Sequence, residues 1–253
     1  MRSILSALLV LVSFVAEAKI AIPPSEPVLI PVAGVYAPEN GYDDNDSIQV
    51  VVDGVLPNAC WVVDHTEAKV LSPSNDIIVQ QYARKQDSEA CRNPEKLPPE
   101  LKLPVSFMSE VSLGVLPHGQ YQMVFSATPG GAITVKPLNI SRAPTTEIDS
   151  LYYAITTELY VPKAVSADRE TTDIRFSGYL SNPCSEMEAD VMAVIQKDVI
   201  VLLPSVHRYD GTCLPIAQEF TRVVTIKTPV AGRYLVQVRS ANGNSVNRFM
   251  TIR

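Results

Sequence analysis

The sequence predicts an all-β protein made of two tandem β-sandwich domains, with one disulfide inside each. Three observations support this prediction: an internal repeat, short apolar runs rich in β-branched residues, and 20 prolines, which suit turns and sheet edges better than helices. No window of the 253 residues has the periodicity of a long amphipathic helix. The length is sufficient for two domains of the usual ~100–150 residues, each with its own core.

The first residues have the pattern of a secretion signal. Arg2 gives a positive start, residues 4–16 are apolar, and Ala16-Glu17-Ala18 matches an A-x-A cleavage site. The apolar run is shorter than the roughly 20 residues that span a bilayer, and no cysteine follows the site for lipid attachment. We therefore expect a signal peptide over 1–18 and an exported protein, periplasmic or extracellular, without stable membrane insertion. A retained signal anchor is the alternative.

The repeat is clearest in a seven-residue stretch that occurs as Gly54–Cys60 and again as Gly178–Cys184. Gly, Leu, Asn and Cys hold the same places in both copies, and further matches follow in the same order on either side. We interpret each stretch as the end of a strand that enters a disulfide-tethered loop. The Asn would bond the backbone at the turn, and the Leu would be the last core residue. The chain is then a tandem duplication, with domains predicted at 19–143 and 144–253.

The four cysteines of an exported chain are expected to form two disulfides. Four cysteines allow three pairings, and the repeat selects the one that places a bridge in each copy: Cys60–Cys91 and Cys184–Cys213. A zinc site is the alternative, but the sequence has neither a C-x-x-C nor a His-x-x-x-His spacing.

The predicted strands within each copy are short. Asn242-Gly243 is a strong hairpin signal because both positions tolerate the positive φ of such turns, and Pro129-Gly130-Gly131 takes that place in the first copy. Residues 186–196, the best helix candidate, are predicted as loop plus strand because their counterpart over 61–71 is β-like. The clearest β-runs cover residues 47–52, 61–71, 77–82, 172–176, 199–203, 223–226 and 234–238.

The segment Leu116-Pro-His-Gly119-Gln-Tyr121 resembles the tyrosine corner of immunoglobulin-like and related Greek-key sandwiches. In that corner the Tyr hydroxyl bonds the upstream backbone and holds the connection between the two sheets. The second copy has Pro229-Val-Ala-Gly232-Arg-Tyr234, which keeps the Gly and the Tyr but lacks the Leu. The resemblance implies an immunoglobulin-like sandwich for each domain, as architecture only.

One pair of positions departs from that pattern. In antibody-type domains a cysteine follows the corner tyrosine by two residues and bridges the sheets, whereas Met123 and Val236 stand there in this chain. The resemblance therefore implies a disulfide that ties two loops at one pole. It also implies that the domains follow one another head to tail, as beads joined by the polar linker 142–149.

Composition and motifs exclude several classes of function. The net charge of −6, without a Lys/Arg cluster, argues against nucleic acid or anionic membrane as a partner. We nominate no catalytic residue: the cysteines are committed to bridges, no G-x-S-x-G motif occurs, and His65, His118 and His207 lack the neighbours of a triad. We expect no cofactor and a monomer.

Asp43, Asp44 and Asp46 form the candidate metal site. Oxygen ligands this dense suit Ca²⁺, but the segment lacks the Gly and the distant Glu of an EF-hand. A solvated turn is the default interpretation, and calcium is the alternative. Asn45 and Asn139 begin glycosylation sequons, which matter only in a eukaryotic host.

The predicted binding surface is the disulfide pole of the first domain, whose loops include Trp61, Arg92, Asn93 and Lys96. The loop over residues 92–104 contains an insertion, since Cys91 and Gly119 are 28 residues apart and their counterparts Cys213 and Gly232 are 19 apart. Prolines stiffen the loop, which lowers the entropy cost of binding, although neutral loop growth is equally cheap. The leading hypothesis is a secreted, non-enzymatic interaction or structural protein of an envelope or cell surface, which binds an unknown protein or a surface glycan.

Two other functions remain open at the level of sequence. A periplasmic pilus-type chaperone has a similar two-sandwich form, but it needs basic residues in a cleft between the domains, and no such pair can be assigned here. A carbohydrate-binding or accessory module usually presents several planar aromatic residues, and a single Trp with 7% aromatic content is unfavourable for that role.

Overall fold

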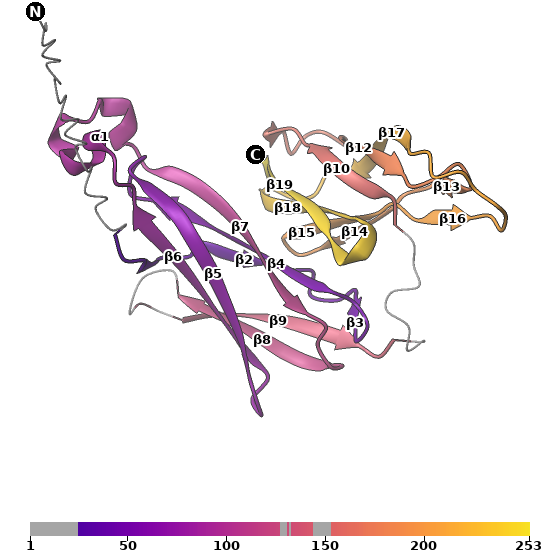
Figure 1. The fold of residues 1–253 in the computed structure, drawn as a ribbon, viewed down its shortest axis with the longest axis horizontal. Coiled ribbons are helices and arrows are strands. Elements are labelled where there is room, and N and C mark those ends of the chain that lie inside the picture. Colours follow the sequence, from indigo (N-terminus) through magenta and orange to yellow (C-terminus); the bar gives the residue numbers. More distant parts are fainter. Residues whose placement is uncertain (1–24, 127–130, 132, 144–152) are drawn as a thin grey trace, which may run out of the picture.

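The computed structural model describes residues 25–126, 131, 133–143 and 153–253, and this part of the chain is almost entirely β-structure. The predicted signal peptide at 1–18, the domain boundary at 143/144, the linker 142–149 and the Pro129–Gly131 turn lie wholly or partly outside these residues. Among the described strands no pairing crosses from residues 25–143, the N-terminal unit, to residues 153–253, the C-terminal unit. Figure 1 shows the two units side by side.

The elements of the N-terminal unit are β1 (Val28–Ile30), β2 (Gly34–Tyr36), β3 (Tyr42–Asp43), β4 (Ile48–Leu56), β5 (Trp61–Leu71), β6 (Asp76–Lys85), α1 (Glu89–Arg92), η1 (Pro94–Lys96), η2 (Pro99–Lys102), β7 (Val105–Gly114), β8 (Gly119–Ser126) and β9 (Ile133–Ser141). Those of the C-terminal unit are β10 (Ile155–Tyr160), β11 (Ala164–Val165), β12 (Thr171–Leu180), β13 (Ser185–Met187), β14 (Met192–Gln196), β15 (Val199–Leu203), β16 (Val206–Arg208), β17 (Gln218–Lys227), β18 (Gly232–Arg239), η3 (Ala241–Gly243) and β19 (Ser245–Ile252).

Each unit is a sandwich of two sheets around its own core. In the N-terminal unit the sheet β2-β4-β7 faces the sheet β1-β6-β8-β9-β3, to which β5 adds at β6. In the C-terminal unit β10-β12-β17 faces β11-β19-β18-β15-β14, and β13 and β16 form an additional two-stranded sheet. Alternating residues of each strand point inward, so Val50 and Val52 pack with Met123 and Leu138 in the first core. The second core is built in the same way. The all-β fold with one disulfide in each unit confirms the predicted fold class.

In the N-terminal unit, β8 pairs with the second strand of the β5–β6 hairpin and not with the first. β6 pairs with β8 in parallel, and β5 lies outside β6. The C-terminal unit repeats this order: β15 pairs with β18 in parallel, and β14 lies outside β15. The arrangement is compatible with an immunoglobulin-like sandwich. In the immunoglobulin fold, however, the first strand of the hairpin, and not the second, pairs with the strand that follows the tyrosine corner. Because both units share the difference, it belongs to the repeat.

The local predictions around the hairpins are confirmed. Residues 61–71 form β5, and the ambiguous segment 186–196 forms part of β13, a loop and β14. The turn at Asn242-Gly243 joins β18 to β19, with Gly243 at φ +70°. The inserted residues 92–104 fold into the short helical turns η1 and η2.

The prediction that the two units follow one another as beads is wrong. The outer face of β2-β4-β7 packs on the outer face of the sheet that contains β15, β18 and β19 (Figure 1). Tyr36 and Val51 from the N-terminal unit share a buried cluster with Val199, Val201 and Leu235 from the C-terminal unit. The physical reason is that β4 and β18 are apolar on both faces, and such strands must be covered on both sides.

Polar contacts surround this apolar contact between the units. Asp53 pairs with Arg233 and Lys136 pairs with Asp198. The side chain of Asn247 donates to Glu110 at 2.7 Å, and the guanidinium of Arg239 donates to the carbonyl of Gly41 at 3.0 Å. The interface therefore has the apolar centre and polar border typical of stable association.

Candidate functional site

The repeated Gly-x-Leu-x-Asn-x-Cys stretch directs a core strand into the disulfide. Leu56 is buried at the end of β4, and the side-chain oxygen of Asn58 accepts a hydrogen bond from the backbone amide of Cys60 at 2.9 Å. Asn182 accepts from the amide of Cys184 at 3.0 Å in the same way. The glycine is required because a Cβ at Gly54 would lie 2.6 Å from the ring of Phe107.

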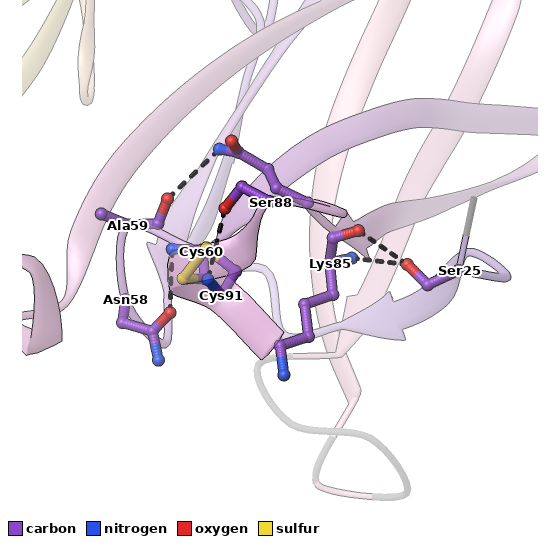
Figure 2. The surroundings of a disulfide bond; sticks show 8 residues. Ser25, Asn58, Ala59, Cys60, Lys85, Ser88 and Cys91 are labelled. Atoms are coloured by element: carbon purple, nitrogen blue, oxygen red, sulfur yellow. Dashed lines mark hydrogen bonds between the residues drawn. A yellow bond between two sulfur atoms is a disulfide. The ribbon is translucent and has the colours of Figure 1, made fainter. Parts of the chain in front are cut away.

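The disulfide Cys60–Cys91 joins the end of β4 to α1, and Cys184–Cys213 is its counterpart, as the repeat predicts. Figure 2 shows the bridge between Asn58 and Ser88, whose side-chain oxygens point to backbone amides of the two cysteines. Ser88 caps α1 by accepting from the Cys91 amide at 3.3 Å. The amide of Gln86 donates to the Cys60 carbonyl at 2.8 Å. We call residues 57–61 and 86–105 the disulfide rim.

The insertion in the rim is ordered by a small core of its own. Leu97 is buried against Cys60 and Cys91, so the disulfide is part of the packing as well as a covalent link. The amide of Ala59 donates to the carbonyl of Leu101 at 3.1 Å, and the Lys102 ammonium donates to the carbonyl of Glu95 at 3.0 Å. These contacts fix η1 and η2 against the end of β4.

Three of the four predicted binding residues meet on this insertion. Arg92 ends α1 and its guanidinium donates to Asp87 at 2.8 Å, which lowers the pKa of the Asp87 carboxyl. Asn93 and Lys96 are exposed in the next turn, where the Lys96 amide donates to the Asn93 carbonyl at 2.9 Å. Trp61 is different: it begins β5 and packs half-buried on the cluster of Ile30, Leu56 and Ala83 at the base of the rim.

Sequence reasoning missed an aliphatic row on the same insertion. Leu101, Leu103 and Val105 are 40%, 61% and 39% exposed. The sequence pattern that indicates these residues is the alternation Leu101-Lys-Leu103-Pro-Val105, which is typical of a half-buried strand. The surrounding prolines and charged residues obscure it. An exposed apolar row bordered by charged side chains is the composition of a protein-binding surface.

Both corner tyrosines bond the backbone four residues upstream. The hydroxyl of Tyr121 donates to the carbonyl of Pro117 at 2.9 Å, and that of Tyr234 donates to the carbonyl of Val230 at 3.0 Å. Neither Gly119 nor Gly232 has a positive φ, and a Cβ at either would come nearest to the corner tyrosine itself. The corner lies at the entrance of β8 and β18, away from the disulfide rim.

Two of the three aspartates in the candidate calcium segment have side-chain partners within the chain, whereas one oxygen of Asp43 is buried without a hydrogen bond among the described residues. Asp44 accepts from the amide of Ala143 at 2.7 Å and contacts His118 at 3.1 Å, and the bond from Ala143 leads the causes that lower its pKa. Asp46 accepts from the amide of Asp43 at 3.0 Å. Among the residues that the structure describes, no group of three or more potential ligands is arranged to hold a metal. Calcium therefore gains no support from the geometry.

The histidines lie in separate surroundings. His65 stacks on Tyr82 with ring centroids 4.6 Å apart, and its hydrogen bond to Asp64 raises its pKa. His118 lies between Asp44 and Arg142, and His207 contacts the ring of Tyr209 edge-on.

No helix within the described ranges is long and apolar enough to cross a bilayer. Comparisons of the chain with protein-family models, with curated proteins and with solved structures find no match.

Proposed function

We propose that this chain is an exported, non-enzymatic protein of two immunoglobulin-like sandwiches, which binds a partner protein at an envelope or cell surface through the disulfide rim. The observation that carries this proposal is the aliphatic row of Leu101, Leu103 and Val105, held at the surface by a disulfide and by Leu97. Aliphatic side chains that lie close together in the sequence and are exposed on an ordered loop favour a partner protein as the ligand.

Rigidity supports the rim as a binding surface. The cap at Ser88, the bond from Ala59 to Leu101 and the packing of Leu97 hold the insertion in one conformation before a partner arrives. A loop that is already ordered loses less conformational entropy on binding. Figure 1 shows α1 at the end of the N-terminal unit remote from β3, where the C-terminal unit does not cover it. Two disulfides also favour an oxidising compartment outside the cytoplasm.

A pilus-type chaperone is less well supported. That function needs basic side chains presented in a cleft between the sandwiches. Three basic residues between these units, Arg233, Lys136 and Lys197, are each paired with a carboxylate of the opposite unit. A fourth, Arg239, is buried against Gly41 and Tyr42, so it is not presented in an open cleft.

Site-specific photocrosslinking tests the proposal. A photoreactive amino acid replaces Leu103 on the rim or, as the matched control, Val135 on β9, which is 49% exposed. Irradiation of cells of the source organism should give a discrete crosslinked partner only from position 103, and Leu103→Glu in a chain labelled at Val105 should abolish it. Equal crosslinking from both positions, or none from the rim, would refute the rim as a binding surface.

A further inference from the structure

The outer face of the sheet β10-β12-β17 contains a polar groove that the disulfide rim does not explain. Its volume is about 430 Å³, and it is lined by residues of all three strands, among them Glu158, Ser177, Tyr179, Glu219 and Thr221. These side chains share one face because Glu158 is opposite Ser177, Ser177 is opposite Thr221, and Tyr179 is opposite Glu219. The opposite face of β12 carries Ile174 and Phe176 into the core.

The backbone pairing beside the groove is irregular. The register between β10 and β12 shifts between Thr156 and Glu158, so Thr157 bulges from the ladder. Gly178 lies opposite this bulge, and a Cβ there would overlap the carbonyl oxygen of Ile155. The glycine lets β10 approach β12 closely at the bulge, and the groove lies on the outer face beside this irregular pairing.

The polar groups in the groove are fixed in orientation. One carboxylate oxygen of Glu158 accepts from the hydroxyl of Tyr160 at 2.8 Å and from that of Ser177 at 3.0 Å. These bonds, with that from Tyr160 the larger cause, lower the pKa of Glu158, so the acceptor stays ionised. Arg175 covers the ring of Tyr160 at 4.5 Å, which leaves Tyr179, 38% exposed, as the open aromatic surface of the groove.

Comparison of the two copies shows that this face has changed its role. In the N-terminal unit the equivalent face, with Val51 and Asp53, is covered by the C-terminal unit. The positions equivalent to these two residues by the repeat carry Arg175 and Ser177, and the next outward position carries Tyr179 in place of Val55. The second copy therefore lacks the apolar residue and the acidic residue that make the contact between units, and it has an aromatic ring beside hydroxyls and a carboxylate instead.

We propose that this groove binds a neutral oligosaccharide. A sugar ring presents C–H bonds to an aromatic face and hydroxyls at its edge. Tyr179 can match the former, and the neighbouring Glu158, Ser177, Glu219 and Thr221 can match the latter. The two glutamates repel anionic glycans and leave neutral ones. The proposal is independent of the rim, because the groove and the rim lie on different units.

Titration calorimetry with a panel of neutral hexasaccharides (cellohexaose, chitohexaose and maltohexaose) tests it on the full mature chain, with a heparin hexasaccharide as the anionic probe. At least one neutral member should bind and the anionic probe should not. Tyr179→Ala should weaken binding by about tenfold or more, whereas Tyr179→Phe should retain it. Tyr209→Ala is the matched control, an exposed tyrosine of the same unit outside the groove, and it should bind as the wild type does.

Three outcomes would overturn the proposal. The first is that no neutral member binds, and the second is that binding survives both Tyr179→Ala and Glu158→Gln in chains shown by thermal melting to be folded. The third is self-association in sedimentation velocity that Tyr179→Ala abolishes, which would mean that the face still docks a second copy of this chain, as its N-terminal equivalent docks the C-terminal unit.

Discussion

Arg233 on β18 pairs with Asp53 on β4 and thereby joins the two units across their packed sheets. The Asp53 side chain is 2% exposed, and its second oxygen has no hydrogen-bond partner among the described residues. The Arg233 side chain is 45% exposed and also lies 4.1 Å from the centre of the Phe249 ring. A carboxylate this buried depends on its partner, so the pair links the stability of one unit to the presence of the other.

Loss of the arginine should therefore destabilise the whole chain. Arg233→Ala leaves Asp53 buried without its main counter-charge, and we expect a loss of about 2 kcal/mol in the free energy of unfolding. This is below the ~3–5 kcal/mol of fully buried pairs because solvent reaches Arg233. Urea unfolding measures it, with the exposed Arg222→Ala as the control. Equal effects of the two substitutions would show that the pair does not link the units.

Asp53 should also give the stability an unusual pH dependence. Burial raises its pKa from the ordinary 3.8, and Arg233 and Lys136 only partly offset this. The folded state then holds the proton more tightly than the unfolded chain. This contribution to stability is full below the unfolded pKa and is lost as the pH rises through the folded pKa.

Asp53→Asn removes that titration, so the stability of the variant relative to the wild type should increase as the pH is raised. Urea unfolding from about pH 3 to about pH 7 measures the difference. Asp44→Asn should show the opposite slope, because the pKa of Asp44 is lowered. A pH-independent difference for Asp53→Asn would contradict the assignment.

The two disulfides should differ in their effect on the disulfide rim, although both should stabilise the chain. Replacing Cys60 and Cys91 together by Ser should lower the free energy of unfolding by about 3–4 kcal/mol and expose Leu97. Hydrogen exchange of the amides over 86–105 should then accelerate. The matched pair, Cys184 and Cys213 both replaced by Ser, should cost a similar free energy but leave exchange in the rim unchanged. Unchanged rim exchange in the first variant would show that the insertion does not depend on its bridge.

Sequence alone predicted the features that repeat locally. The duplicated Gly54–Cys60 stretch predicted the bond from Cys60 to Asn58 and the burial of Leu56, because both depend on residues within one turn. It also predicted the disulfide pairing, because each copy holds two cysteines at nearly the same separation, 31 and 29 residues. The parallel pairing of β6 with β8 could not be predicted from the sequence, since strands that are distant in sequence leave no local pattern of their pairing.

The contact between the units corresponds to a recognisable pattern in the sequence. Val50-Val51-Val52 and Leu235-Val236 are unbroken apolar runs, which indicate strands covered on both faces. The duplication makes this pattern hard to interpret, because two equivalent domains are expected to have equivalent surroundings. Their surroundings differ, since Val51 is buried and its counterpart Arg175 is exposed.

The Asn of the repeated stretch should contribute to stability in both units, and more in the second. Asn58→Ala removes the acceptor for the Cys60 amide at 2.9 Å, whereas Asn182→Ala removes the acceptor for the Cys184 amide at 3.0 Å and for the hydroxyl of the buried Ser185 at 3.1 Å. Asn58→Ala should lower the free energy of unfolding by about 1 kcal/mol, as expected for one net hydrogen bond, and Asn182→Ala by about 2 kcal/mol. Asn58→Asp keeps an acceptor and serves as the control. If the alanine variants unfold at the wild-type urea concentration, water replaces the bond and the repetition of Asn in both copies has another cause.

The glycine of the second copy should tolerate a larger side chain less well than other glycines of the chain. A Cβ at Gly178 overlaps backbone atoms of Ile155 and Thr156, and a backbone cannot rotate away as a side chain can. Gly178→Ala should therefore lower the free energy of unfolding by about 3 kcal/mol and disturb the bulge at Thr157. Gly119→Ala is the control, because the nearest atom to its Cβ is 3.6 Å away. Thermal melting compares the two variants, and a Gly178→Ala chain as stable as Gly119→Ala would mean that β10 does not approach β12 as closely as described.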